Sequence, residues 1–201
     1  MKNTILCLTI ALSACSGPQS NEVEMVDRPS TDTRNEFYVS NRAPLQPQQF
    51  IKLPAGTIQP EGWLKQQLNL QRDGLNGHLG EISAWLQKGD NAWLTNGGQW
   101  GWEEVPYWLR GYANLSYIIQ DTQMQGEAKF WIENILKSQR ADGNFGPVHL
   151  NDGKQDFWPN MIVLWIMQSY YEFSNDQRII DFMTNYCNYL QTVPDEDFLS
   201  S

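Results

Sequence analysis

Cysteine, histidine and basic residues are scarce in this chain of 201 residues, and each scarcity excludes a class of protein. We expect no disulfide framework from the three cysteines, because Cys7 falls in a predicted leader sequence and Cys15 is a predicted lipidation site, which leaves Cys187 as the one free thiol. His78 and His149 share no metal-ligand spacing, so we expect no metal site and no cofactor in this chain alone. Fourteen basic residues against 23 acidic ones give a net charge of −9 without a basic cluster, which disfavours nucleic acid as a partner.

The N-terminus also lacks an apolar run long enough to cross a membrane. Its apolar stretch, residues 5–12, falls short of the roughly 20 residues that a spanning helix needs. A short apolar core that follows Lys2 and ends in Leu12-Ser13-Ala14-Cys15 is typical of a lipoprotein signal peptide. We therefore predict a signal peptide at 1–14, lipidation of Cys15, and a membrane anchor in the bacterial cell envelope, in the periplasm or at the cell surface. An ordinary secretory signal is the alternative.

The remaining thiol, Cys187, lies in an aromatic stretch with helical character. A lone cysteine in such a stretch is typically a small buried hydrophobic residue. We therefore expect Cys187 to be buried, and neither the serines nor the cysteines show a nucleophile motif.

The chain changes character after its first forty residues. Residues 15–41 are polar and acidic without a sustained period, which predicts a lipid-anchored flexible tether. Prolines at 44, 47, 54 and 60 exclude a helix interior there and favour an extended segment laid over a domain that spans 42–201. In that domain, apolar periodicity predicts helices at 60–75, 79–86, 102–121, 123–140, 158–173 and 176–192, and no strand pattern is evident.

The last four predicted helices look like two copies of one helical hairpin. Each copy has an aromatic-rich helix, a tight turn with aspartate, and a second helix, at an offset of about 52 to 54 residues. A hairpin cannot bury its apolar face alone, so such pairs stack into solenoids or close into toroids. The predicted fold class is therefore all-α, of the helical-hairpin (α/α)6-toroid type. We expect it to be incomplete in this chain, because about three pairs precede an acidic stub at 194–201.

Aromatic residues are abundant, with nine Trp, eight Tyr and eight Phe, and several gather in loops that also carry Gly and carboxylates. Trp and Tyr beside Asn, Asp and Gly are how proteins stack on sugar faces, although a hydrophobic core uses the same residues. Candidate substrate contacts before and within two of the predicted helices are Glu103, Glu104, Tyr107, Trp108, Asp156 and Trp158.

Each candidate also has a purely structural interpretation. Glu103 and Glu104 suit the positive end of a helix dipole, and Asp156 suits a helix N-cap. The tryptophans suit the rim of the core. Arg110, which follows them, is expected to form an ion pair with one of the two glutamates.

At these residues the chain resembles the glycoside hydrolase family 127 type, the β-L-arabinofuranosidase-like bacterial proteins. The segments that carry the resemblance lie between residues 53 and 190, and they are Pro60-Glu61-Gly62-Trp63-Leu64, Gly74-Leu75-Asn76-Gly77-His78-Leu79, Glu104-Val105-Pro106-Tyr107-Trp108-Leu109-Arg110-Gly111, Ser138-Gln139-Arg140-Ala141-Asp142-Gly143-Asn144-Phe145-Gly146-Pro147, and Asp156-Phe157-Trp158-Pro159. The resemblance implies an (α/α)6 barrel that hydrolyses glycosidic bonds in oligosaccharides or polysaccharides.

The resemblance also implies what this chain lacks. In zinc-containing members the nucleophilic Cys, the other zinc-binding Cys residues and the acid/base Glu lie in later helices, which correspond to positions beyond Ser201. Zinc is therefore implied for a full-length enzyme only, and we expect this chain, as its N-terminal part, to be inactive alone. The alternative interpretation is a non-catalytic helical lipoprotein that binds glycan or protein partners.

Overall fold

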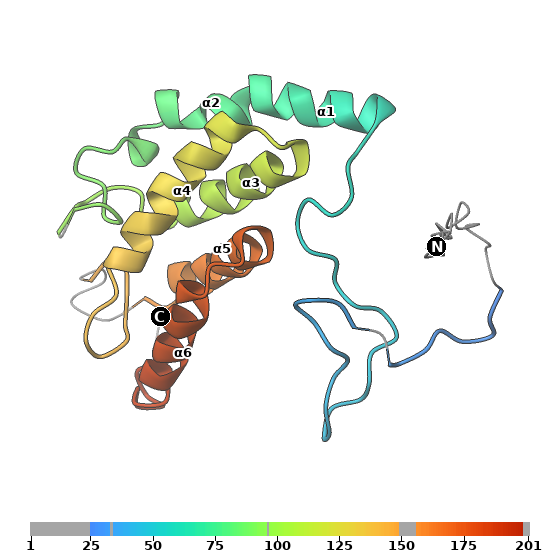
Figure 1. Ribbon diagram of the computed structural model, residues 1–201. Helices are drawn as coiled ribbons and strands as arrows, with labels where there is room; N and C mark the ends of the chain where they lie inside the picture. Colours follow the sequence, from blue (N-terminus) through green and yellow to red (C-terminus); the bar gives the residue numbers. More distant parts are fainter. Residues whose placement is uncertain (1–24, 33, 96, 149–155, 199–201) are drawn as a thin grey trace, which may run out of the picture.

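The computed structural model describes residues 25–32, 34–95, 97–148 and 156–198. Its helices, shown in Figure 1, are α1 (Gly62–Asp73), α2 (Leu75–Ile82), the short 3-10 helix η1 (Ala84–Leu86), α3 (Glu104–Ile119), α4 (Thr122–Lys137), α5 (Trp158–Ser174) and α6 (Arg178–Leu190). Strand pairing within the described residues is limited to two isolated bridges. The prediction of an all-α fold built from helical hairpins is thus confirmed.

The predicted break in the first helical region is wrong by a few residues. Gly74 separates α1 from α2, but Gly77 lies inside α2, whereas the sequence predicted a helix that began only at residue 79. A Cβ atom at Gly77 would lie 1.7 Å from the carbonyl oxygen of Arg72. Glycine is therefore needed at this position because the backbone of α2 closely approaches the last turn of α1. The predicted end of this helix, near Leu86, is the separate helix η1.

The two predicted hairpins are α3 with α4 and α5 with α6, and their turns have the same construction. The first helix of each ends at a residue in the left-handed region, Gln120 with φ 57° and Asn175 with φ 54°. An aspartate follows each of them and accepts from a backbone N–H at the start of the next helix: Asp121 from Met124 and Asp176 from Arg178. Equivalent turns at equivalent places confirm the repeat that the sequence pattern indicated.

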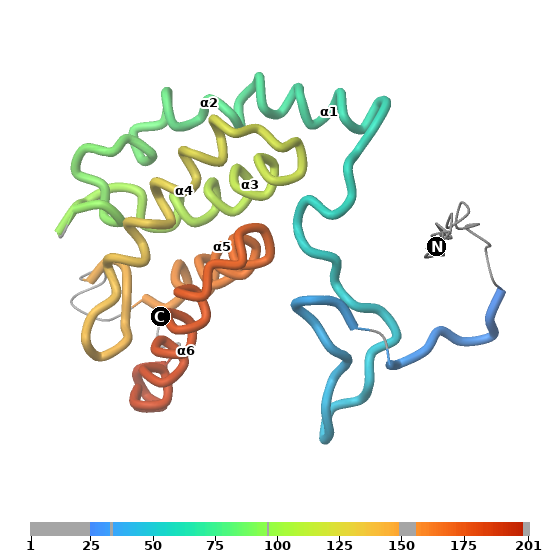
Figure 2. Tube along the Cα trace, viewed as in Figure 1, coloured from blue at the N-terminus to red at the C-terminus, as the bar shows by residue number. Residues whose placement is uncertain are grey.

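Helices α3 and α5 lie side by side in the same direction, and the tube trace in Figure 2 shows α4 and α6 flanking this pair. The largest fully buried side chains come from α3 to α6 and from the loop before α5: Trp131, Tyr117, Tyr186, Phe145, Leu109, Ile132, Ile135, Ile166, Met167, Ile179, Val105 and Val163. Burying these apolar surfaces provides the main favourable free energy of folding. The shared core therefore fixes the relative positions of α3 and α5.

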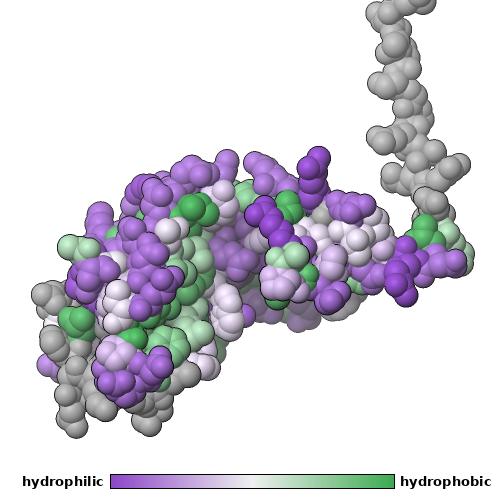
Figure 3. Space-filling model, turned by 90° about the horizontal axis from the view of Figure 1, so that it is seen from below, coloured by the Kyte–Doolittle hydropathy of each residue, from purple (hydrophilic) through white to green (hydrophobic). Residues whose placement is uncertain are grey.

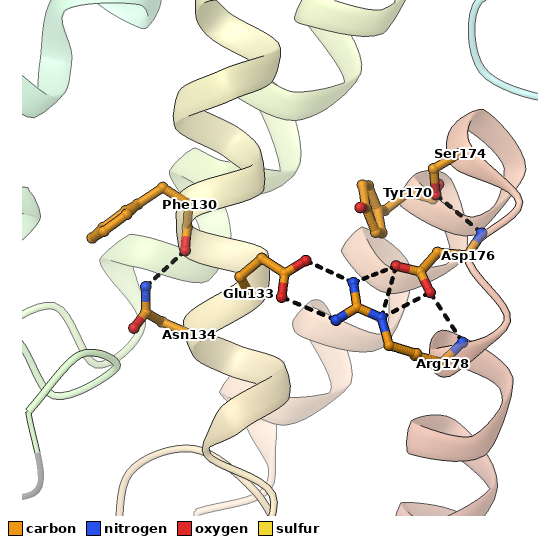
Figure 4. Close-up of polar contacts among 7 residues, drawn as sticks. All are labelled: Phe130, Glu133, Asn134, Tyr170, Ser174, Asp176 and Arg178. Carbon is orange, nitrogen blue, oxygen red and sulfur yellow. Dashed lines mark hydrogen bonds and ion pairs between the residues drawn. The ribbon is translucent and has the colours of Figure 1, made fainter.

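The second halves of the two hairpins are joined by an ionic cluster, drawn in Figure 4. Arg178 at the start of α6 lies 2.6 Å from a carboxylate oxygen of Glu133 on α4 and 2.6 Å from one of Asp176. The guanidinium, through its hydrogen bonds, lowers the pKa of both carboxyl groups. Its side chain is 57% exposed, so the cluster is a surface connection between α4 and α6.

The chain before α1 forms an N-terminal strap, which we define as residues 34–61. It contains no helix, as the prolines predicted, and it runs beside the helices toward the start of α1 (Figure 1). The Phe37 ring meets the Tyr171 ring edge to face at 5.4 Å, and Tyr38 donates a hydrogen bond to the Glu172 carboxylate. Contacts with the helical domain therefore begin earlier than residue 42, where the sequence placed the domain boundary.

The expectation that Cys187 is buried is wrong. Cys187 is exposed, because the buried positions of α6 are Ile179, Phe182 and Tyr186, and the next residue points away from that face. Helix α1 buries none of its residues, and Trp63 is 74% exposed. Viewed from below in Figure 3, hydrophobic residues form a band across the helical part of the molecule.

No helix in the described part of the chain combines the length and the apolar character needed to cross a bilayer. The predicted signal peptide and Cys15 lie outside the described residues.

Candidate functional site

The loops that precede α3 and α5 lie against each other. The ring of Trp93, from the first loop, packs so tightly on Gly146 of the second that a Cβ atom there would lie 2.6 Å from it. Gly146 has φ 74°, a conformation that favours glycine. Arg140 donates to the Gly146 carbonyl oxygen at 2.9 Å within this loop, and the Gly146 backbone N–H donates to the hydroxyl of Ser138, the C-cap of α4, at 2.9 Å. The two loops therefore bring the beginnings of α3 and α5 to one end of the domain.

At this end, two of the predicted substrate contacts meet. The indole Nε1 of Trp158, at the start of α5, donates a hydrogen bond of 2.7 Å to the hydroxyl oxygen of Tyr107 in the first turns of α3. The two side chains remain 54% and 49% exposed, respectively. A polar contact between two large rings holds their orientation while leaving much of their surface open.

Further exposed hydrophobic side chains continue along α5 from Trp158. Met161 and Trp165 follow it at intervals of three and four residues and are about half exposed, whereas Ile162, Val163 and Ile166 are buried. The i, i+3, i+7 spacing places all three exposed residues on one side of the helix. Sequence reasoning missed Met161 and Trp165, although their spacing from Trp158 was available as a signal.

Arg110 on α3 extends this surface. Its guanidinium carbon lies 4.2 Å from the centroid of the Trp165 ring, which is a cation–π arrangement. The expected ion pair with Glu103 or Glu104 does not form, because the guanidinium lies over the α5 ring instead. We call the surface made by Tyr107, Arg110, Trp158, Met161 and Trp165 the aromatic face.

The predicted carboxylates lie at the helix starts beside the aromatic face. Glu103 immediately precedes α3 and is exposed, and Glu104 is the first residue of α3 and half-buried. Asp156 accepts a hydrogen bond of 2.9 Å from the backbone N–H of Trp158. The N-cap position of α5 is Phe157, so Asp156 lies one residue before the predicted cap position and contacts the first backbone N–H of the helix.

A family model described as the GH127 catalytic domain of β-L-arabinofuranosidase matches residues 22–199. The chain belongs to this family. No curated protein and no solved structure matches the chain. Its family membership confirms the resemblance drawn from the sequence motifs and makes a glycan the substrate class that the family implies.

Not every candidate contact in this GH127 domain joins the aromatic face. The Trp108 side chain is 8% exposed, and its Nε1 donates to the Asn76 carbonyl oxygen at 3.2 Å. Its ring packs on those of Tyr112 and Trp131, with centroids 4.6 and 6.0 Å apart. Trp108 lies one residue after Tyr107, and consecutive helical residues point in directions about 100° apart. It therefore belongs to the core.

The described residues of the GH127 domain do not fit a zinc site. Within these ranges, no three His, Cys, Asp or Glu side chains gather as metal ligands do. The imidazole Nδ1 of His78 lies 2.8 Å from Glu81, and His149 lies outside the described residues. The groups that the described residues place at the candidate site are aromatic rings, one guanidinium and the carboxylates at the helix starts.

Proposed function

We propose that this chain serves glycoside hydrolysis at the bacterial cell envelope and that its aromatic face binds the sugar residues of an arabinofuranose-bearing glycan. The observation that carries the proposal is the half-exposed row of Trp158, Met161 and Trp165 beside Tyr107, found in a member of the GH127 family.

The exposure of these side chains needs a reason. A large apolar side chain gains about 1.5–3 kcal/mol when it is fully buried, so leaving several half-exposed on adjacent turns forgoes stability. Contiguous exposed apolar patches mark binding surfaces. The C–H groups of a sugar ring fit the flat face of an indole, and its hydroxyls suit the nearby carboxylates and the Tyr107 hydroxyl.

We further propose that this chain alone binds glycan without hydrolysing it. Glycoside hydrolysis usually needs a pair of carboxyl groups on either side of the scissile bond, or a different nucleophile. A cysteine nucleophile is not available at the aromatic face in the described residues. Their cysteine, Cys187, is exposed on α6, whereas the aromatic face is made by α3 and α5. The carboxylate of Asp156 accepts a hydrogen bond from the backbone N–H of Trp158.

The location at the envelope rests on the sequence leader. We propose that the chain is processed after Ala14 and acylated on Cys15, which tethers the sugar-binding domain to a membrane. The expected result in a bacterial host is a membrane-bound product that carries fatty acyl chains by mass spectrometry. A Cys15→Ser variant should be recovered without acyl chains. Acylation at another residue, or a wild-type product without acyl chains, would contradict the proposed anchor.

Binding and hydrolysis can be separated in one experiment on the chain itself. We expect calorimetric titration with β-L-arabinofuranosyl oligosaccharides to detect binding, and sugar analysis of the same mixture to find no released arabinose. Trp158→Ala should weaken binding about tenfold, which corresponds to about 1.4 kcal/mol. Trp63→Ala is the matched control, since Trp63 is an exposed tryptophan on α1, away from the aromatic face.

The outcomes separate the two parts of the proposal. Arabinose release by the chain alone would show that its own residues suffice for catalysis. Absence of binding, or equal losses in the Trp158→Ala and Trp63→Ala variants, would refute the aromatic face as the glycan site and favour a non-catalytic lipoprotein with another partner.

A further inference from the structure

Arg110 is held in place on the aromatic face but has no anionic partner in the described chain. Its guanidinium carbon lies 4.2 Å from the centroid of the Trp165 ring. The ion pairs formed within the described ranges involve other cations, namely Lys52, Arg72, His78, Lys88 and Arg178. Arg110 is therefore an ordered cation whose charge no carboxylate of these residues neutralises.

The chemistry of a guanidinium over an aromatic ring defines what it can still bind. A guanidinium carries five N–H donors in one plane, and a contact with one aromatic ring leaves donors available for a further ligand. A carboxylate can approach in that plane and accept two parallel hydrogen bonds. Holding the guanidinium against Trp165 also lowers the conformational entropy that Arg110 loses when a ligand binds.

Arg110 and the Tyr107–Trp158 pair occupy successive places along one surface. Arg110 follows Tyr107 by one turn of α3, and Trp165 follows Trp158 by two turns of α5, about 10 Å at 1.5 Å per residue. A sugar that stacks on Trp158 would therefore extend its neighbouring residue toward Arg110.

We propose that the aromatic face recognises a glycan with a carboxylate-bearing sugar residue, a uronate, and that Arg110 binds this carboxylate while Trp165 positions Arg110. This inference rests on the proposed glycan binding of the aromatic face. The net charge of −9 repels a polyanion at long range, so the site suits a glycan with an isolated carboxylate better than a continuous polyuronate.

The test uses a pair of ligands that differ only in charge. A trisaccharide with one terminal glucuronate is titrated calorimetrically into the full chain, and its methyl ester serves as the neutral ligand of nearly the same shape. At low salt we expect the acid to bind about tenfold more tightly than the ester, a difference that shrinks in high salt because the charges are screened.

Variants assign this preference to single residues. Arg110→Gln should abolish the preference for the acid, so that the acid and the ester bind this variant with equal affinity. Arg110→Lys should restore part of it, since a lysine keeps the charge but loses the two-pronged geometry. Trp165→Leu should reduce it about threefold, because Arg110 keeps its charge and loses its support. Lys65→Gln, on α1, is the control that removes one positive charge elsewhere.

Two results would overturn the inference: equal affinity of the wild type for acid and ester, or equal effects of Arg110→Gln and Lys65→Gln on the affinity for the acid. If neutral arabinofuranosyl oligosaccharides still bind in that case, the proposed function stands and only the role of Arg110 fails. If no oligosaccharide binds, the proposed function fails with it.

Discussion

One side of α5 is exposed to solvent near the start of the helix and covered near its end. Near its start, Trp158, Met161 and Trp165 are about half exposed. Continuing at the same spacing, Gln168 and Glu172 lie under the N-terminal strap, and the Glu172 side chain is 0% exposed. One helix face is therefore open at one end and covered by the chain itself at the other.

The covered end has the polar partners that a buried charge requires. Glu172 accepts hydrogen bonds from the Tyr38 hydroxyl, from Lys52 Nζ at 2.7 Å and from the Ala55 backbone N–H at 3.2 Å. Burying a carboxylate is costly unless it is paired and hydrogen-bonded. Within the described ranges, the open end has no comparable set of enclosing contacts. The strap end therefore supports stability through buried polar contacts, whereas the aromatic end carries the proposed ligand site.

The largest expected effect comes from removing the carboxylate at the covered end. Glu172→Ala leaves three polar partners without their acceptor and should lower the free energy of unfolding by about 3 kcal/mol. Chemical denaturation at neutral pH measures this loss. Glu103→Ala, which removes an exposed carboxylate at the open end, is the matched control and should change stability by about 0.5 kcal/mol or less. Similar losses in both variants would remove the distinction between the two ends.

A smaller effect is expected for Tyr38→Phe, about 1–2 kcal/mol at neutral pH, because the hydroxyl that donates to Glu172 and accepts from Gln168 is lost. Burial, together with the hydrogen bond to Glu172, raises the pKa of Tyr38 to about 12 from the usual 10.0. A pKa raised by folding contributes stability that is complete below pH 10 and is lost as the pH rises through 12.

The difference in stability between wild type and Tyr38→Phe should therefore shrink between pH 10 and 12. Denaturation curves across this range check the sign. Tyr112 has a similarly raised pKa in both proteins, so their common alkaline loss cancels in the difference. A difference that stays constant with pH would mean that Tyr38 is not protected by the strap contacts.

An arginine near the covered end tests whether burial, rather than the number of bonds, makes the difference. Arg178 bonds to both Glu133 and Asp176, but its side chain is 57% exposed. Arg178→Ala should therefore lower stability by about 1 kcal/mol or less at low salt, and by still less in high salt.

The pH dependence of the Arg178 variant has the opposite sign to that of Tyr38. Arg178 lowers the pKa of both carboxyl groups, so its contribution is present above their ordinary values of 3.8 and 4.5 and is lost as the pH falls through the lowered values. Thermal melts at pH 7 and in this acidic range measure the change. A loss as large as that of Glu172→Ala would show that exposed networks matter as much as buried ones.

Sequence periodicity predicted the hairpins because their apolar residues recur at helical spacing and their turns carry capping residues. The same spacing also indicates which neighbouring residues lie outside the buried face of a helix. On α6 the buried series Ile179, Phe182 and Tyr186 already places Cys187 outside the buried face. On α3 the buried residues Val105, Trp108 and Leu109 likewise leave Tyr107 outside.

Sequence periodicity could not predict the polar contacts at the covered end of α5. Glu172 meets Tyr38, Lys52 and Ala55 across 117 to 134 residues of sequence, and no local pattern specifies which distant polar groups will meet. The position of Arg110 is similar, because the nearby glutamates gave it a plausible local partner. The guanidinium of Arg110 contacts the Trp165 ring instead, because α3 and α5 pack side by side and bring the two side chains together.

The smallest expected effect on stability is at the open end itself. Trp158→Ala removes a ring that is 54% exposed and one hydrogen bond to Tyr107, so the free energy of unfolding should fall by only about 0.5–1 kcal/mol. The same variant should weaken glycan binding. At the covered end, Glu172→Gln keeps the shape of the side chain but removes its charge, so it should lower the free energy of unfolding and leave the affinity for glycan unchanged. Melting curves measure the stability of both variants, and calorimetric titrations measure their affinity for glycan. A large stability loss with unchanged affinity in Trp158→Ala would place Trp158 in the core and make the two ends of α5 alike.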